Sequence, residues 1–114
     1  MDGLSASLIV KALDGLAMRS SAISQNIANA NSRGYLPLKV RFEDELRHAA
    51  VAGEDAVRKV QPEFVRTVAN DSDAKVRLDL EMASASETSL RYSALIDVLS
   101  RQMQISHLAV TGGQ

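Results

Sequence analysis

The fold of this chain is decided by one stretch, Ser24-Gln25-Asn26-Ile27-Ala28-Asn29-Ala30-Asn31-Ser32-Arg33-Gly34-Tyr35. Its three closely spaced asparagines and its glycine suit a helix end better than a helix interior, because both residue types tolerate the left-handed backbone that terminates many helices. The stretch therefore predicts that a helix ends here and that Tyr35 begins an extended segment.

The segment before this stretch has the period of a helix that packs along its whole length. Apolar and small residues alternate at spacings of three and four, the pattern of a helix–helix contact. These residues are Ala6, Ile9, Leu13, Leu16, Ser20, Ile23, Ile27 and Ala30. We expect a helix over residues 1–31 that begins near Asp2 or Ser5 through capping. Gly15 should weaken it by about 1 kcal/mol relative to alanine.

A second seam of the same period occupies residues 78–111 and predicts a second long helix. It consists of Met82, Ala85, Ser89, Tyr92, Ile96, Leu99, Met103, Ser106 and Val110. Asp79 and Glu81 lie near the expected start, where negative charge interacts favourably with the helix dipole. Gly112-Gly113 should end this helix.

The middle of the chain changes period. Leu38, Val40 and Phe42 alternate with charged residues after Pro37, which predicts a short half-exposed strand within residues 35–44. A short helix is expected over residues 43–52, ended by Gly53. Residues 53–77 are expected to form short strands or irregular loop, with a turn at Asn70-Asp71-Ser72-Asp73.

Composition limits the classes of function. The chain has 114 residues, a net charge of −1 and no cysteine, which indicates one domain, no disulfide framework and no electrostatic attraction to nucleic acid. Residues 36–81 hold 18 of the 27 charged side chains, so both ends are poor in charge. The apolar runs are too short for a transmembrane helix, and Lys11 and Asp14 interrupt the opening that a secretory signal would need.

These patterns predict a mainly α protein whose long terminal helices pack as a coiled coil around a small β-containing middle. We expect residues 1–34, 35–77 and 78–114 to form its three parts, together one domain. Two helices alone would leave flanking apolar positions exposed (Leu8, Ala12, Leu95 and Val98), and such surface normally marks an interface. The chain should therefore complete its core by assembling with copies or relatives. The alternative is an ordinary helical hairpin in a monomer.

A search for chemistry indicates that the chain is not an enzyme. His48 and His107 have no partner at metal-ligand spacing, and the acidic run 43–45 points in different directions on a helix. Neither a nucleophile elbow nor a phosphate-binding glycine loop is present. We therefore expect no cofactor, no metal, no small-molecule substrate and no nucleic-acid partner.

Four runs resemble the bacterial flagellar rod and hook proteins. Residues 26–35 are similar to the N-I-A-N-A-N-T-P-G-Y signature that closes the N-terminal helix of that family, with Ser32-Arg33 in place of Thr-Pro, and Val40-Arg41-Phe42 follows as it does there. The run Val76-Arg77-Leu78-Asp79-Leu80-Glu81-Met82-Ala83 resembles the family's V-D-L-x-x-E-M run, and Leu90-Arg91-Tyr92-Ser93-Ala94-Leu95 resembles its L-x-Y-x-A-L run. Residues 44–75 carry no strong motif.

The resemblance implies a structural subunit of the proximal rod, the hollow drive shaft in the periplasm that transmits torque for swimming. It further implies export through the flagellar type III apparatus without a cleaved signal peptide. The expected partners are copies of the chain, other rod proteins, the membrane-ring and export-gate base of the basal body, and the export apparatus. Helical ends of this kind order on polymerising, since ordering costs about 1–2 kcal/mol per residue that burial must offset.

The residues expected to matter are assembly residues. The assembly seam consists of Ile9, Leu13, Leu16, Ile23, Ile27, Tyr92, Ile96, Leu99 and Met103, and the signature loop of Asn26, Asn29, Asn31, Gly34 and Tyr35. The asparagines are expected to bond backbone groups at the helix end and on a neighbouring subunit. The alternative function is a soluble export chaperone or adaptor that binds other helices, which would be a stable folded dimer in dilute solution.

Overall fold

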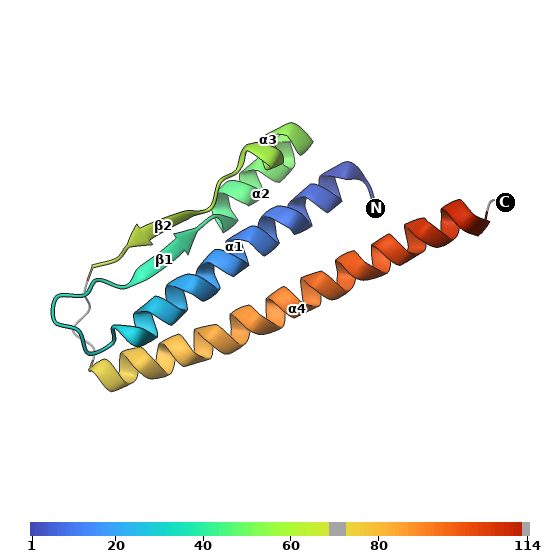
Figure 1. Cartoon of the computed structure of the whole chain (residues 1–114). Helices are drawn as coiled ribbons and strands as arrows, with labels where there is room; N and C mark the ends of the chain where they lie inside the picture. Colours follow the sequence, from blue (N-terminus) through green and yellow to red (C-terminus); the bar gives the residue numbers. More distant parts are fainter. Residues whose placement is uncertain (69–72, 113–114) are drawn as a thin grey trace.

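Two long helices, α1 (Gly3–Ala28) and α4 (Ala74–Gly112), run antiparallel and lie side by side along most of α1 (Figure 1). This computed structural model describes residues 1–68 and 73–112. Between the two helices in sequence come β1 (Leu38–Arg41), α2 (Glu43–Ala52), α3 (Glu54–Lys59) and β2 (Glu63–Arg66). The predicted mainly α fold, with long terminal helices and a small β-containing middle, is confirmed.

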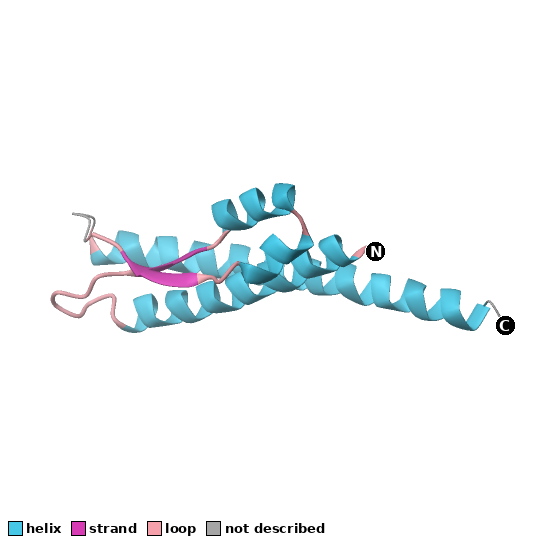
Figure 2. Cartoon of the chain, turned by 90° about the horizontal axis from the view of Figure 1, so that it is seen from above, coloured by secondary structure: helices cyan, strands magenta, loops and turns pink. Residues whose placement is uncertain are grey.

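The helix α4 is much longer than its partner. At 1.5 Å per residue α1 measures about 39 Å and α4 about 58 Å, so the end of α4 projects beyond the start of α1, as both views show (Figures 1 and 2). The molecule measures 63 × 26 × 15 Å and has a radius of gyration of 17.7 Å. A compact chain of this length would have a radius of gyration near ~13 Å. Much of α4 therefore lacks a tertiary neighbour.

The middle segment covers the side of α1 that faces away from α4 (Figure 1). The strands β1 and β2 form an antiparallel ribbon, with register running from Leu38↔Arg66 to Arg41↔Glu63. The core lies between this segment and α1, and it consists of Leu16, Ala22, Val40, Phe42, Leu46, Val57 and Val60. In the described part of the chain the buried hydrophobic cluster thus belongs to α1 and the middle segment, and Leu95 of α4 packs against its edge.

One close contact fixes the position of the middle segment on α1. Gly15 is buried beneath the ring of Phe42, and a Cβ placed on Gly15 would lie 2.6 Å from three ring carbons. The glycine that weakens the isolated helix is therefore the residue that lets the aromatic ring reach the helix backbone. Arg19 lies over the same ring, with its guanidinium carbon 5.0 Å from the ring centroid.

Several predicted boundaries change. The first helix ends at Ala28 rather than residue 31, and the second begins at Ala74 rather than 78. The six-residue helix α3 lies where strands or loop were expected. The sequence of α3 is mostly charged and Pro62 follows it, so the pattern did not indicate a helix. Its Val57 is nevertheless buried, at 0% exposed. Of the predicted turn at residues 70–73, residues 70–72 lie outside the described part of the chain.

The mechanism of helix termination also differs from the prediction. No described residue other than glycine has a positive φ, so none of the three asparagines adopts the left-handed backbone. Asn29, at the C-cap, has φ −109°. Within residues 1–68 and 73–112, positive φ values occur at Gly34 (φ 75°) and Gly53 (φ 125°). Asn26 and Asn29 act through their side chains, as the second part of the prediction expected.

Candidate functional site

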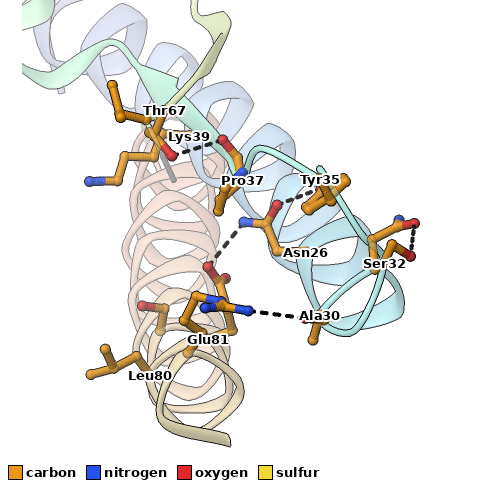
Figure 3. A pocket seen from close by; sticks show the side chains of 13 residues that line it. Asn26, Ala30, Ser32, Tyr35, Pro37, Lys39, Thr67, Leu80 and Glu81 are labelled. Atoms are coloured by element: carbon orange, nitrogen blue, oxygen red, sulfur yellow. Dashed lines mark hydrogen bonds between the residues drawn. The ribbon is translucent and has the colours of Figure 1, made fainter. Parts of the chain in front are cut away.

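The side chain of Asn26 is the centre of the signature loop (Figure 3). Its Nδ2 donates to the carbonyl oxygen of Leu38 at 2.9 Å and to Oε1 of Glu81 at 3.0 Å. Its Oδ1 accepts from the hydroxyl of Tyr35 at 2.7 Å and from the backbone N–H of Leu38 at 2.8 Å. The amide, 5% exposed, therefore uses both donors and both acceptor sites. One side chain thus joins α1, the loop, β1 and α4.

Asn26 also closes one edge of the β ribbon. The amide pairs with both the N–H and the C=O of Leu38, as a neighbouring strand would, on the edge of β1 opposite β2. Further along that edge, Arg19 donates to the carbonyl oxygen of Val40 at 3.4 Å. Side chains of α1 therefore satisfy backbone groups that would otherwise be left unpaired at a strand edge.

The turn that leads into β1 is built on Gly34. The N–H of Tyr35 donates to the carbonyl oxygen of Ser32 at 3.3 Å, and Gly34 occupies the third position of this turn with φ 75°. These features match a type II turn, in which the third residue needs a positive φ. Arg66 lies over the Tyr35 ring, with its guanidinium carbon 5.3 Å from the centroid. The turn thus aims Tyr35 back at Asn26.

Replacing Arg33 by proline should raise the free energy of unfolding by about 0.4–1 kcal/mol. Arg33 is the second residue of the turn, where type II geometry favours proline, and its N–H donates no hydrogen bond to the described residues. Urea unfolding followed by circular dichroism measures the change. The matched Gly34→Ala variant should be destabilised, because its φ is unfavourable for alanine. A destabilised Arg33→Pro chain would show that this turn is not type II.

Asn29 finishes the helix and ties it to the loop. Its Nδ2 donates to the carbonyl oxygen of Gln25 at 2.9 Å, and its Oδ1 accepts from the Ser32 hydroxyl at 3.2 Å. The next residue, Ala30, accepts from the guanidinium of Arg77 on α4 at 3.4 Å. Asn31 is exposed, and its side chain makes no hydrogen bond to another described residue. Two of the three predicted asparagines therefore bond groups within their own chain.

A cavity of about 340 Å³ opens between the signature loop and the first turns of α4 (Figure 3). Its lining includes Asn26, Tyr35, Lys39, Leu80 and Glu81. Burial raises the pKa of the Glu81 carboxyl, opposed by the Asn26 hydrogen bond and the charge of Lys39. In the described residues no three His, Cys, Asp or Glu side chains are grouped so as to hold a metal ion. Most of the polar groups that line this cavity already form hydrogen bonds that hold the signature loop in place.

A second polar cluster links α1, α2 and α4. Arg19 forms a two-pronged ion pair with Glu43, with Nη1 donating to Oε2 at 3.1 Å, and Arg91 of α4 lies 3.6 Å from the same oxygen. The hydrogen bond from Arg19 lowers the pKa of Glu43, aided by the charge of Arg91 and opposed by burial. The sequence predicts only that the carboxylates of residues 43–45 point in different directions on a helix, and no local spacing shows that two distant arginines converge on Glu43.

These two carboxyls should contribute to stability with opposite dependence on pH. The contribution of Glu43, whose pKa is lowered, is full above the unfolded value near ~4.3 and is lost as pH falls through the folded value. The contribution of Glu81, whose pKa is raised, is present below that unfolded value and is lost as pH rises through the folded value.

At pH 7 the Glu43→Gln variant should therefore be less stable by about 0.5–1 kcal/mol, the range for a half-exposed ion pair. Glu81→Gln should be as stable as the parent or more stable, since glutamine keeps the acceptor for Asn26. Urea midpoints at pH 7 and pH 3.5 check both, and both differences should shrink at the lower pH. A loss of stability in Glu81→Gln at pH 7 would contradict the assigned cost of burying its charge.

The assembly-seam residues divide between the core and the surface. Leu13, Leu16 and Ile23 are buried, and Ile9, Ile27 and Leu99 are half-buried. Tyr92, Ile96 and Met103 remain 37%, 39% and 65% exposed. The face of α4 against α1 carries instead residues such as Glu81, Thr88 and Leu95, just beside the predicted seam. The α4 seam is therefore only partly used within the chain.

No protein-family model matches the chain, and no curated protein is significantly similar to it. None of the helices within residues 1–68 and 73–112 combines the length and apolar character needed to cross a bilayer. The features that bear on function are therefore the signature loop and the surface of α4.

Proposed function

We propose that the chain is a structural subunit of the bacterial flagellar basal-body rod, and within the rod family a relative of the proximal rod protein FlgB. The observation that carries this proposal is the surface of α4, which exposes many large apolar side chains on the sides that α1 does not cover. Eleven large apolar residues of α4 are exposed: Val76, Leu80, Met82, Leu90, Tyr92, Ile96, Val98, Met103, Ile105, Leu108 and Val110.

Large apolar residues exposed in this number usually mark a surface that another protein covers. Within the chain, α4 packs mainly against α1, and its Arg91 also reaches Glu43 of α2. We expect other protein helices to cover the exposed apolar residues of α4. Copies of the chain and related rod proteins would supply them, with the terminal helices forming a hollow shaft and the middle segment forming its outer surface.

The signature loop supports a mechanical role. Asn26 and Arg77 connect the base of the helix pair, where α1 ends and α4 begins, to the signature loop. Glu43 connects both helices to the middle segment through its ion pairs with Arg19 of α1 and Arg91 of α4. Polar networks of this kind fix one arrangement of the elements they join. A shaft that transmits torque needs such fixed joints between its inner helices and its outer surface. The work would be done without catalysis or a cofactor.

Quantitative mass spectrometry of basal bodies extracted in detergent tests the proposal. Enrichment of the untagged chain at a few copies per particle, together with loss of swimming when its gene is deleted, is the expected result. The control is the same extraction from a strain whose basal bodies stop at the membrane ring, which should lack the chain. A chain that stays in the cytoplasm and is absent from complete particles would overturn the assignment.

Replacing Asn29 by leucine should block assembly while leaving expression intact. The substitution removes the hydrogen bond to the Gln25 carbonyl and the bond from the Ser32 hydroxyl, which should cost about 1 kcal/mol or more and release the loop from the helix end. Motility in soft agar and the amount of the chain in basal bodies give the readout. Normal swimming in this variant would remove the cap from the mechanism.

The same exposed face of α4 favours one other function, a helical adaptor or export chaperone that binds helices of other proteins. Such a protein would be a stable dimer at low concentration and would stay outside the basal body. Sedimentation velocity at micromolar concentration distinguishes the two, because a rod subunit should remain monomeric there and associate only at higher concentration.

A further inference from the structure

The helix α1 is held by the middle segment along its whole length. At its start, Glu54 of α3 lies so close to Gly3 that a Cβ on this glycine would be 2.7 Å from a carboxylate oxygen. Near its centre Gly15 lies beneath the ring of Phe42, and at its end the side chain of Asn26 bonds to the backbone of β1. These contacts use no residue of α4, so they do not depend on where α4 lies.

The buried hydrophobic cluster has the same distribution. Its members come from α1, β1, α2, α3 and the links between them, and Leu95 of α4 only packs against it. In proteins most of the stability of a helix comes from the packing of one of its faces. For α1, one such face is supplied entirely by residues within 1–68.

The contact between α1 and α4 is less complete. Of the 39 residues of α4 only Thr88 is buried, whereas six of the 26 residues of α1 are buried. The half-buried residues of α4 include the polar Glu81 and Gln102. A groove of about 300 Å³ also opens along this contact, between Leu16 and Thr88. Part of the interface therefore lacks the close packing from which dispersion attraction arises.

We propose that α4 separates from α1 in a local opening of the native chain, while α1 and the middle segment stay folded. The helix α1 has partners on two sides and keeps one of them when α4 leaves. The helix α4 has its main partner on one side and loses it. Order that depends on a partner is therefore a property of α4 and not of both terminal helices, and the N-terminal helix is held ready by the middle segment.

Hydrogen exchange of the purified full-length chain at micromolar concentration, followed by mass spectrometry, tests this opening. The slowest amides of α4, near Glu81 and Thr88, should exchange roughly tenfold or more faster than the slowest amides of α1. Equal rates in the paired parts of the two helices would show that they open together and would overturn the proposal. An unprotected α1 would overturn it as well.

A pair of core variants separates the two openings. Val57→Ala lies in the cluster that persists when α4 leaves, so it destabilises the closed and the α4-open forms alike. It should therefore speed the exchange of α1 by about tenfold or more and leave that of α4 nearly unchanged. Leu95→Ala weakens the contact that is broken in the opening, and it should speed the exchange of both helices.

Each outcome decides for or against the opening. Faster exchange of α4 in Val57→Ala, to the same extent as in α1, would show a single cooperative unit. Unchanged exchange of α4 in Leu95→Ala would show that the opening does not break the α4 contact. The comparison of α1 with α4 in the parent chain decides the question even if a variant fails to fold. All of these measurements use the isolated chain, so they are independent of its recovery in basal bodies.

Discussion

Replacing Asn26 by leucine should lower the free energy of unfolding by about 2–4 kcal/mol and, under the proposed rod function, abolish swimming. The substitution leaves both backbone groups of Leu38 without a partner and also removes the partner of the Tyr35 hydroxyl. An unsatisfied buried polar group costs about 1–3 kcal/mol, so two of them account for most of this effect. Urea unfolding by circular dichroism and soft-agar motility are the measurements.

Two further variants at the signature loop make this prediction specific. Asn26→Asp keeps the acceptor for Tyr35 but points a second carboxylate oxygen at the Leu38 carbonyl and at Glu81, so it should be nearly as destabilised at pH 7 and should partly recover in acid. Asn31→Leu alters the same motif at an exposed position and should change stability by less than about 0.5 kcal/mol. Equal effects at Asn26 and Asn31 would contradict the network.

Replacing Phe42 by alanine should cost about 3–4 kcal/mol, because the ring is 2% exposed and lies at the centre of the cluster between α1 and the middle segment. Gly15→Ala should also destabilise, by about 1–3 kcal/mol, although alanine is the better helix former by about 1 kcal/mol. Its Cβ has no room beneath the ring.

The two substitutions should be strongly coupled. In the Phe42→Ala background the space above Gly15 is empty, so Gly15→Ala should become stabilising and gain the helix propensity that the ring denies it in the parent. A double-mutant cycle on urea unfolding measures this reversal of sign. Phe64→Ala serves as the control, since Phe64 is 48% exposed on β2 and should cost little. Additive effects at residues 15 and 42 would disprove the close contact.

Features governed by local period or backbone chemistry could be predicted from the sequence. Apolar residues spaced three and four apart predicted both long helices, and the alternation after Pro37 predicted β1. Gly53 ends α2 as expected. Short or charged elements gave no such signal: α3 was missed because its six residues hold one buried apolar side chain. The early start of α4 was missed because the turn signal at residues 70–73 obscured it.

The candidate site was only half predictable. The sequence identified Asn26, Asn29 and Tyr35 as special and predicted that asparagine side chains bond backbone groups at the helix end, as Asn29 does, but it did not identify the partners of Asn26. The pairing of Asn26 with Leu38 and Glu81 spans 12 and 55 residues. The convergence of Arg19 and Arg91 on Glu43 is similarly long-range. No spacing rule reaches such distances, because they depend on how the finished helices and strands pack.

The difference in length between α1 and α4 determines which part of the molecule unfolds first. Past Leu99 every described residue of α4 is exposed except Gln102, which is half-buried, while the joints at Asn26, Arg77 and Glu43 lie further toward the base. A pull on the C-terminus would therefore unwind several turns before it broke a single tertiary bond. Amide protons should exchange fastest at that end and progressively more slowly toward the base. The C-terminal part of α4 is thus the part of the molecule that can unfold while the rest of the fold stays intact.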